Sequence, residues 1–497
     1  MKKIQSALIS VFYKDGLEPL VRELAAQNIT IYSTGGTQKF IEALGINCTA
    51  VEDVTSYPSI LGGRVKTLHP KMFGGILYRR ELEEDIEQIE KYEIPPIDLV
   101  IVDLYPFEET LASGADDAAI IEKIDVGGPS MIRAAAKNHK DVAVVANKDL
   151  YATLTQLLQT QNGSTTLEQR RDFAKQAFAV TAHYDKAISE YFAPKTALRY
   201  GENPHQKAEF KGDLEKVFTK LHGKEISYNN LLDINAALDL MGEFLVCEPT
   251  FAILKHNNAC GVATRPTLVE AYEKALEGDP ISAFGGVLIA NREMDLETAQ
   301  KVNTLFYEVV IAPGYENEAL ELLKSKKNRV LLVADLEANK AQQTSERTML
   351  GGILSQQKDN LVGGIDGESK LATTATVDAD TMAELIFANK IVKHSKSNAI
   401  VLSKNGMLLG SGVGQTSRVD ALKHAIEKAH SFELDLNGAV MASDAFFPFA
   451  DCVEIAHKAG ITAVIQPGGS VRDGETVEYC NENGVAMIIT GTRHFKH

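Results

Sequence analysis

The pattern of apolar and polar residues along the first part of the chain alternates between two periods. Residues 4–10 and 29–33 form short apolar runs typical of strands, whereas residues 16–27 repeat leucine and valine at helical spacing. Residues 98–102 and 142–146 are almost entirely apolar, as expected of strands buried on both faces. Strands that alternate with helices in this way predict an α/β fold with a parallel sheet and right-handed crossovers.

Three loops of this predicted sheet carry polar residues and glycines. Residues 10–16, 33–37 and 103–107 each follow a predicted strand. Parallel strands end at one edge of a sheet, and ligands of such sheets bind at that edge. We therefore expect these loops to share a ligand-binding edge.

A proline-containing break separates two unequal parts of the chain. Residues 168–191 are helical in pattern throughout, and the segment 192–196 (FAPKT) follows them. We place a domain boundary there, which predicts domains at 1–195 and 196–497. The second part also mixes helical patterns with short apolar runs, at residues 251–254, 286–290, 330–333, 399–403 and 463–466.

The composition argues against several functional classes. The chain has 497 residues, of which 44% are hydrophobic, enough for two or three domains with substantial cores. It has 51 Lys and Arg against 67 Asp and Glu, and this net charge of −16 argues against a nucleic-acid or anionic-membrane partner. Its five cysteines are scattered without a CxxC pair, which predicts neither a disulfide framework nor a thiolate zinc site and fits a reducing cytoplasm. No apolar stretch of the sequence is long enough to cross a bilayer.

The most conspicuous motif of the first part is the segment 62–70, GGRVKTLHP. Its two glycines let backbone N–H groups approach an anion closely, and Arg64, Lys66 and Thr67 add two charges and a hydroxyl donor. The segment lacks the P-loop pattern. On its own it fits a phosphate site and an exposed basic turn equally well.

Two further glycine pairs precede helical patterns. Gly35 and Gly36 follow a strand and open a helix, and Gly127 and Gly128 stand before another helix in the segment 124–130, IDVGGPS. A helix N-terminus binds phosphate well, but a tight strand–helix turn is the commoner explanation of a single motif of this kind. A phosphate site therefore needs more than one of these turns.

Three side chains near these turns are candidates for catalysis. Lys137 falls about three turns into the second helix, where its alanine neighbours predict burial and hence a partner, and Asp125 is the nearest carboxylate. A Lys–Asp pair in a cleft passes protons when burial shifts either pKa, although a structural ion pair is the simpler alternative. Tyr105 follows the buried strand at 98–102 and is expected at the same edge, either as packing or as a catalytic group.

An adjacent lysine and histidine end one apolar run of the second part. Lys255 and His256 follow residues 251–254 and precede a polar turn. Histidine titrates near neutrality and accepts a proton from an amine nucleophile, and a neighbouring lysine stabilises an oxyanion. A Lys-His dipeptide alone usually carries no function, but its place at a strand end favours one.

Other segments of the second part carry anion-binding or aromatic residues. Arg199 lies directly after the boundary in the segment 197–206 (ALRYGENPHQ), and Arg418 ends a glycine-rich loop at 410–418. Residues 443–451 (SDAFFPFAD) combine three phenylalanines with two aspartates, which suits either a core or a slot for a flat ring.

These motifs occur in one order along nearly the whole chain. The first part contains, in order, Ser10, STGGT, GGRVKTLHP, DLYPF, IDVGG and RAAAKNH. The second part continues with LRYGENPHQ, Lys-His, SNA, GQTSR, SDAFFPF and a terminal RHF. In this order they resemble the bifunctional family of purine biosynthesis that joins phosphoribosylaminoimidazolecarboxamide (AICAR) formyltransferase to inosine monophosphate (IMP) cyclohydrolase. The resemblance implies an N-terminal domain like methylglyoxal synthase and a C-terminal cytidine-deaminase-like α/β domain in two repeats. The sequence lacks the zinc-deaminase signature H-x-E with PCxxC, so no catalytic zinc is expected.

The resemblance implies two consecutive reactions. The second domain would move a formyl group from 10-formyltetrahydrofolate to the 5-amino group of AICAR, and the first would close formyl-AICAR to IMP with loss of water. In the transferase, His256 is the implied base and Lys255 its oxyanion or proton partner. The catalytic residues implied for the cyclohydrolase are Lys66 and Tyr105 at the oxyanion and the pair Asp125 and Lys137 in proton transfer.

The same resemblance implies the residues that bind substrates. Those of the first domain are Ser10, Lys14, Thr34, Gly35, Gly36, Thr37, Arg64, Thr67, Gly127 and Gly128. Those of the second are Arg199, Tyr200, Gly201, Asn398, Gln415, Ser417, Arg418, Phe446, Asp451 and Arg493. It further implies a cytoplasmic homodimer, with a structural monovalent cation, K+, near Ser395, Ser397 and Asp444.

The sequence departs from the family's usual residues at five places. This chain has Phe12-Tyr13 where the family commonly has Ser-Asp, and Thr34 where it has Ser. It has Ala259 in place of Pro, Val413 in place of Ala and Cys452 in place of a polar residue. These differences bear on single ligand contacts more than on the reactions.

Two other functions remain open from the sequence. One is a lyase or hydrolase that acts on a phosphorylated sugar through the turns of the first domain, and it leaves the ordered motifs of the second part unexplained. The other is a non-catalytic nucleotide sensor, which would bind AICAR without converting it when the formyl donor is present.

Overall fold

The computed structural model describes residues 1–63, 65–337, 343–365 and 369–497. Arg64, one of the expected phosphate contacts, lies outside the described residues. The described chain divides into two units, Met1–Ala193 and Pro194–His497, each with its own hydrophobic core. Each unit is described separately below.

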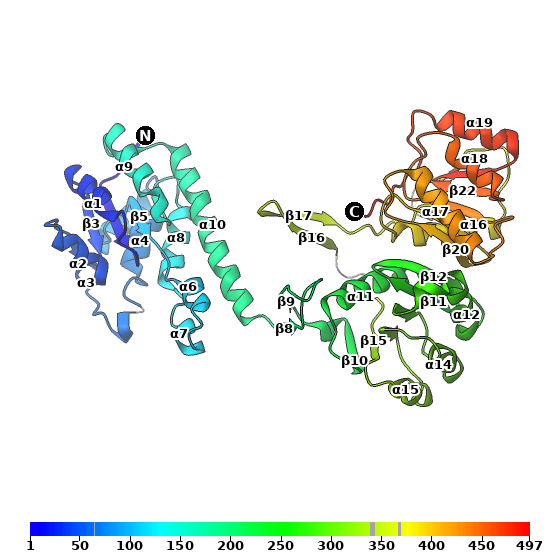
Figure 1. Ribbon diagram of the computed structural model, residues 1–497. Helices are drawn as coiled ribbons and strands as arrows, with labels where there is room; N and C mark the ends of the chain where they lie inside the picture. The colour runs from blue at the N-terminus through cyan, green and yellow to red at the C-terminus, as the bar shows by residue number, and fades with distance from the viewer. Residues whose placement is uncertain (64, 338–342, 366–368) are drawn as a thin grey trace. The chain divides into compact units, whose positions relative to one another are not determined.

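The first unit is built on a five-stranded parallel sheet, drawn in blue to cyan in Figure 1. Its strands, in spatial order, are β4 (Thr49–Ala50), β3 (Thr30–Ser33), β2 (Ser6–Ser10), β5 (Leu99–Val102) and β6 (Ala143–Val145). All neighbouring pairs of this sheet are parallel. Strand β5 is buried along its whole length, as its uninterrupted apolar run predicts. The predicted parallel α/β sheet is therefore confirmed.

Helices connect and cover these strands. They are α1 (Leu17–Ala26), α2 (Gly35–Ala43), α3 (Val51–Thr55), α4 (Pro70–Leu77), α5 (Glu83–Lys91), α6 (Phe107–Ala112), α7 (Asp117–Ile121), α8 (Gly127–Lys137), α9 (Tyr151–Thr160) and α10 (Leu167–Phe192). The long helix α10 begins with a capping box, in which Thr166 and Gln169 satisfy each other's backbone N–H groups, and it packs against α8 and β6. A short antiparallel pair, β1 (Lys2–Lys3) with β7 (Ser164–Thr165), stands beside the sheet.

The second unit is organised around a twelve-stranded mixed sheet in the described residues. One half contains β10 (Phe218–His222), β11 (Thr250–Lys255), β12 (Asn258–Thr264), β13 (Val287–Ala290), β14 (Val309–Ala312) and β15 (Val330–Ala334). The other contains β18 (Lys370–Leu371), β19 (Ile400–Lys404), β20 (Met407–Gly412), β21 (Val440–Ser443), β22 (Ala463–Gln466) and β23 (Ala486–Ile489). Figure 1 shows the first half in green and the second in yellow to red.

The two halves have the same topology. In the first half, an antiparallel hairpin (β11–β12) leads to three parallel strands (β13, β14, β15), and β10 closes the edge in antiparallel orientation. The second half repeats this arrangement with β19–β20, then β21, β22 and β23, and β18 at the edge. The halves join where β12 runs antiparallel to β20. The expected two repeats are confirmed.

Helices cover both faces of this sheet. One face carries α12 (Leu268–Gly278), α14 (Leu296–Val302), α15 (Asn317–Lys324), α17 (Arg418–Ser431), α18 (Asp451–Lys458) and α19 (Asp473–Asn483). The opposite face carries α11 (Tyr228–Met241) and α16 (Ala379–Lys393). A short helix, α13 (Pro280–Ala283), precedes β13. Two antiparallel hairpins complete the unit: β8 (Lys195–Leu198) with β9 (Ala208–Lys211), and β16 (Thr344–Met349) with β17 (Gly352–Gln357).

Candidate functional sites

The carboxyl edge of the first unit's sheet brings together the loops after β2 and β3. The hydroxyl of Thr37 donates to the carbonyl of Val11 (2.9 Å) and accepts from the N–H of Val11 (3.1 Å). Thr34 stands at the N-cap position of α2, and Gly35 begins the helix with a φ of 54°. A residue with a side chain adopts this backbone conformation only rarely, so the turn uses glycine for a physical reason.

The segment after Gly63 reaches the N-termini of two helices. A Cβ atom at Gly35 would lie 2.7 Å from the Lys66 ammonium nitrogen, and one at Gly127 would lie 3.0 Å from the Thr67 hydroxyl. Lys66 therefore stands over the first turn of α2, and Thr67 over the first turn of α8. Two helix N-termini, an ammonium group and a hydroxyl donor at one place form an environment that favours a phosphate group.

Asp125 closes the same site from the side of α8. Its carboxylate accepts a hydrogen bond from the N–H of Gly128 (2.8 Å) and further N–H bonds from Gly127 and Tyr105. Its own N–H donates to the hydroxyl of Tyr184 (2.9 Å). Burial nevertheless raises the pKa of Asp125 above its ordinary value, so its carboxyl group holds a proton more readily than an exposed aspartate does.

Tyr105 and Lys14 complete this edge. The Tyr105 ring packs edge-on against Phe12, with ring centres 5.8 Å apart, and its side chain is 45% exposed. Burial of the hydroxyl and the nearby Asp125 raise the pKa of Tyr105. The Lys14 ammonium donates to the carbonyls of Val11 and Phe12, and burial lowers the pKa of Lys14. The edge thus combines hydrogen-bond donors with two carboxylates, Asp103 and Asp125, whose pKa burial raises.

In the second unit, Lys255 is the last residue of β11 and His256 begins the turn to β12. The Lys255 ammonium donates to the carbonyl of Phe284 (2.6 Å). The turn is held from α11, because the N–H of Asn257 donates to the carboxylate of Asp233 (2.7 Å). His256 and Asn257 both have positive φ angles (51° and 65°), a conformation that histidine and asparagine adopt more readily than most residues.

A cavity of about 230 Å³ opens beside this turn. Its walls come from both repeats, and they are formed by Lys255, His256, Asn258, Ala259, Cys260, Gly278, Asp279, Ser282, Leu408, Gly410, Ser411, Val413 and Lys428. Lys255 and His256 therefore face one space, together with the glycine-rich end of β20. A base and an ammonium group that share a cavity suit proton removal from a nucleophile beside a developing negative charge.

The segments around Asn398 and Gln415 meet at the same turn. The N–H of Lys396 donates to the side chain of Asn258 (3.0 Å), and the N–H of Gly414 donates to the carbonyl of Lys396 (2.6 Å). Asn398 and Gln415 exchange two backbone hydrogen bonds (3.1 and 3.3 Å). The structure thus brings Asn398 and the glycine-rich loop next to the Lys255–His256 turn.

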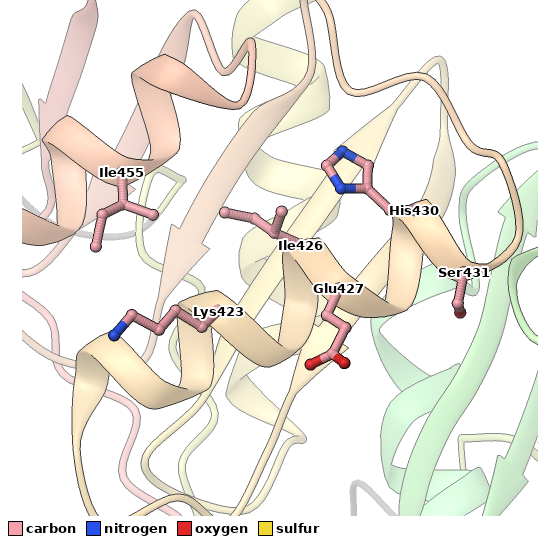
Figure 2. A pocket seen from close by; sticks show the side chains of 6 residues that line it. All are labelled: Lys423, Ile426, Glu427, His430, Ser431 and Ile455. Carbon is pink, nitrogen blue, oxygen red and sulfur yellow. The ribbon is translucent and has the colours of Figure 1, made fainter.

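A second cavity lies elsewhere in this unit, between α17 and α18 (Figure 2). It measures about 540 Å³ and is lined by Lys423, Ile426, Glu427, His430, Ser431 and Ile455. Ile426 and Ile455 come from neighbouring helices and form its apolar part, while the charged side chains stand around them (Figure 2). None of the residues predicted to be functional lines this cavity.

Comparison with known families decides between the functions that the sequence left open. The family described as AICARFT/IMPCHase bienzyme matches residues 135–428, and the MGS-like domain family matches residues 16–130. A protein of Bacteroides thetaiotaomicron named bifunctional purine biosynthesis protein PurH is 59% identical over 508 residues, which cover 100% of this chain and 99% of that protein.

The chain belongs to the AICARFT/IMPCHase bienzyme family. Proteins of the same name from Persephonella marina and Aquifex aeolicus are 45% and 46% identical, and each match covers 99% of this chain and 100% of the other. The family resemblance drawn from the ordered motifs is therefore confirmed, as is an N-terminal domain of the MGS-like kind. The sugar-phosphate lyase and the nucleotide sensor receive no support from these comparisons.

One expected pair of this bienzyme's first domain does not form. Lys137 was expected to be buried and paired with Asp125, but it is exposed and is the last residue of α8, whereas Asp125 precedes the first. The helix that lies between Asp125 and the side chain of Lys137 has eleven residues, which corresponds to a length of about 16 Å. The predicted burial of Lys137 and its pairing with Asp125 within this unit are therefore wrong, and the charged neighbour that helps raise the pKa of Asp125 is Asp103.

Arg418 also differs from its expected role. It is 7% exposed, and its guanidinium is held by the carboxylate of Asp444, the side-chain oxygen of Asn398 (2.8 Å) and the carbonyl of Ala399 (3.2 Å). These partners occupy both terminal nitrogens, so Arg418 fixes the surrounding loops instead of presenting a free fork to a phosphate. Ser417 similarly caps α17 through Asp420.

Four other predicted residues of the second unit make local contacts, and of these Arg199 and Arg493 are exposed while Gly201 is buried. The guanidinium of Arg199 lies over the ring of Tyr200, 5.6 Å from its centre, and Gly201 donates to the carbonyl of Gln206 (2.7 Å). Arg493 stacks on Phe495 (4.4 Å). None of these four residues is among those that line the Lys255–His256 cavity in the described part of the chain. The structure therefore does not bring them to the cavity of that pair.

The aromatic segment SDAFFPFAD divides between core and surface. Phe447 is fully buried, whereas Phe446 is 37% exposed and Phe449 lies under the guanidinium of Arg472 (4.9 Å). Asp451 begins α18, and its carboxylate accepts from the N–H of Cys452 (2.8 Å). Of the three rings only Phe447 enters the core, and a slot for a flat ring formed by the others stays a prediction.

Sequence reasoning missed two carboxylates that organise these sites. Asp103 accepts the N–H groups of Phe12 and Tyr13, and Asp233 accepts that of Asn257. Asp103 directly follows a buried strand, which was a usable signal. Asp233 lies within an ordinary helical pattern, which gave no signal of its role.

In the described residues, no cluster of three or more His, Cys, Asp or Glu side chains suits a metal ion, and no helix is long and apolar enough to span a membrane.

Proposed function

We propose that this protein transfers a formyl group from 10-formyltetrahydrofolate to AICAR and then closes formyl-AICAR to IMP. Membership of the bienzyme family supports both steps. We assign ring closure to residues 1–195 and formyl transfer to residues 196–497. The observation that carries the assignment is that Lys255 and His256 line one cavity of the second unit, while Lys66, Thr67 and Asp125 meet at two helix N-termini of the first.

The transferase step needs help because the 5-amino group of AICAR is a weak nucleophile. Its lone pair is delocalised into the imidazole ring, so attack on the formyl carbon requires removal of a proton and close positioning. His256 takes that proton as the C–N bond forms. Lys255 stabilises the negative charge on the formyl oxygen until the folate nitrogen leaves, and the proton taken from the amine passes to that nitrogen. Asn398, Phe446 and Asp451 are assigned to the region that binds the folate and the ring.

The cyclisation step joins the carboxamide nitrogen to the formyl carbon and releases water. We assign the phosphate of the ribotide to the turns at Gly35–Thr37 and Gly127–Gly128, with Thr67 as a hydroxyl donor. Lys66 and the hydroxyl of Tyr105 stabilise the oxyanion of the ring-closure intermediate. Asp125, whose pKa burial raises, exchanges the proton that must leave the nitrogen and reach the departing hydroxyl.

A coupled assay tests the whole proposal. The purified protein is supplied with AICAR and 10-formyltetrahydrofolate, and the expected product is IMP together with tetrahydrofolate in equal amounts. The same protein supplied with formyl-AICAR alone is expected to form IMP without the folate. AICAR that binds but stays unconverted when the formyl donor is present would support a nucleotide sensor and overturn the proposal.

We also propose a potassium ion near Ser395, Ser397 and Asp444. Asp444 is fully buried, and its Oδ2 atom has no hydrogen-bond partner in the part of the chain that the structure describes. A buried carboxylate oxygen without a partner suits a cation. Replacing K+ by tetramethylammonium is expected to lower the Tm of the wild-type second unit's transition but not that of Asp444→Asn. Equal Tm changes in both proteins, or none in either, would count against the ion.

The remaining expectations concern assembly and location. We propose a homodimer in the cytoplasm, and the family resemblance is what supports both. Sedimentation equilibrium at micromolar concentration is expected to give twice the mass of the 54.1 kDa chain, and a mass of one chain would contradict the dimer. Fractionation of the source cells tests the location.

A further inference from the structure

Asp279 is a buried carboxylate in the wall of the Lys255–His256 cavity, and the roles described above do not use it. It follows α12 and is 3% exposed. Its Oδ1 atom accepts the N–H of Ser282 (2.8 Å) and so caps α13, while its Oδ2 atom pairs with the ammonium of Lys428 (2.6 Å). Lys428 lies on α17, in the other repeat. This ion pair therefore joins the two repeats at the cavity.

Close packing of the helices brings the two charges within reach. A Cβ atom at Gly412 would overlap the carbonyl of Ala421, and one at Gly410 would overlap that of Ala425, so α17 lies directly on β20. A Cβ atom at Gly278 would lie 2.8 Å from the carbonyl of Leu408, so the end of α12 touches the same strand. Helices that approach a strand this closely leave no room for side chains between them. The geometry of the ion pair is thus set by the backbone of both repeats.

A short chain of contacts connects Asp279 with Lys255. Asp279 caps α13, α13 leads directly into Phe284, and the carbonyl of Phe284 accepts the Lys255 ammonium (2.6 Å). The turn ends at Gly285, whose N–H donates to the carbonyl of Phe306 (2.8 Å). The four residues Lys255, Asp279, Ser282 and Lys428 line the same cavity. Displacement of the 279–285 turn would therefore move the oxygen that holds Lys255.

We propose that Asp279 and Lys428 are positioning residues for formyl transfer. Their ion pair fixes the 279–285 turn, and the turn holds the Lys255 ammonium at the formyl oxygen through the Phe284 carbonyl. A misplacement of about 1 Å in a catalytic group lowers a rate by about 100-fold, so a contact that contributes no atom to the chemistry still controls kcat. The inference rests on the proposed transferase function of Lys255.

The test compares Lys428→Met and Asp279→Asn with the wild-type enzyme. Methionine keeps much of the lysine stem without its charge, and asparagine keeps the cap on Ser282 without its charge. We expect each variant to lower kcat of formyl transfer about 10- to 100-fold, with KM for AICAR changed by less than about threefold. Cyclisation of supplied formyl-AICAR, which is assigned to the first unit, is expected to stay at the wild-type rate. A wild-type circular dichroism spectrum and Tm are the expected evidence that the second unit, which contains both residues, is folded.

Three further variants separate positioning from general loss of structure. Lys423→Met removes an exposed lysine from the same helix, at the cavity of Figure 2, and is expected to leave kcat unchanged. Lys428→Arg retains the charge and is expected to recover most of the rate. The double variant is expected to be no slower than the slower single variant, because both remove one interaction.

The outcomes distinguish this inference from the proposed function. If the wild-type enzyme makes no formyl-AICAR, the transferase assignment itself fails. If it does make formyl-AICAR, three results would show that the positioning role is wrong while the function stands. These are a kcat within about twofold of wild type in both single variants, a change in KM alone, and effects that multiply in the double variant.

Discussion

Replacing His256 with asparagine is expected to lower the rate of formyl transfer by about 10²- to 10⁴-fold, because general acid–base catalysis contributes rate enhancements of this size. Cyclisation of supplied formyl-AICAR is expected to stay intact. Asparagine suits the experiment because it tolerates the positive φ of this position (51°) and cannot act as a base near neutral pH. The backbone of the turn, held through Asn257 and Asp233, is therefore expected to persist. The measurement is the initial rate of tetrahydrofolate release, followed beside the rate of IMP formation from formyl-AICAR.

The matched control for this variant lies in the other repeat. Asn405 occupies the turn between β19 and β20, which corresponds to the β11–β12 turn, and has a φ of 53°. Asn405→Ala strains a turn that does not line the Lys255–His256 cavity, and it is expected to leave formyl transfer unchanged. A loss of both activities in His256→Asn would refute separate sites. Full formyl transfer in that variant would remove His256 from the mechanism.

The apolar pattern predicted the central strands of the first unit well, for a physical reason. The runs at 29–33, 98–102 and 142–146 became β3, β5 and β6 with shifts of one residue at their ends, because a strand covered on both faces must be apolar throughout. The two-residue strand β4 and the exposed hairpin β16–β17 went unpredicted, because neither buries a continuous apolar run that would leave a periodic signal. Buried strands of the second unit such as β14 and β21 were missed as well, although their residues are buried throughout.

The error at Lys137 came from reading neighbours in sequence as neighbours in space. Ala134, Ala135 and Ala136 are buried, but Lys137 lies four residues after Arg133, and residues four apart share one face of a helix. Arg133 is exposed, so the four-residue spacing between Arg133 and Lys137 places Lys137 on the solvent face as well. Helical periodicity was the correct guide here, and the run of alanines was not.

The role of Arg418 depended on information that local sequence does not carry. Its partner Asp444 comes from a different strand end, 26 residues along the chain, and meets it only after β19 and β21 pair. The sequence pattern identified a glycine-rich loop that ends in arginine, but it did not indicate which way the guanidinium turns. A residue of this kind is located by motif and assigned a role only by tertiary contacts.

Changes at Lys66 are expected to have the opposite effect to those at His256. Lys66→Met is expected to lower cyclisation by about 10²- to 10³-fold, the usual cost of removing one group that stabilises an oxyanion, and to leave formyl transfer unchanged. The measurement is IMP formation from supplied formyl-AICAR. In the coupled assay this variant is expected to accumulate formyl-AICAR, because the transferase in the second unit continues to run.

A glycine substitution tests the placement of the same ammonium group without removing it. In Gly35→Ala the new Cβ atom would lie 2.7 Å from the Lys66 nitrogen, so either the lysine or the first turn of α2 must move. We expect cyclisation to fall by about 10²-fold, since a displacement of about 1 Å has this effect on a catalytic group. Gly45→Ala is the control, because Gly45 also has a positive φ (77°) and a Cβ there meets no atom within 4 Å. Normal cyclisation in Gly35→Ala, or an equal loss in Gly45→Ala, would contradict the placement of Lys66 over α2.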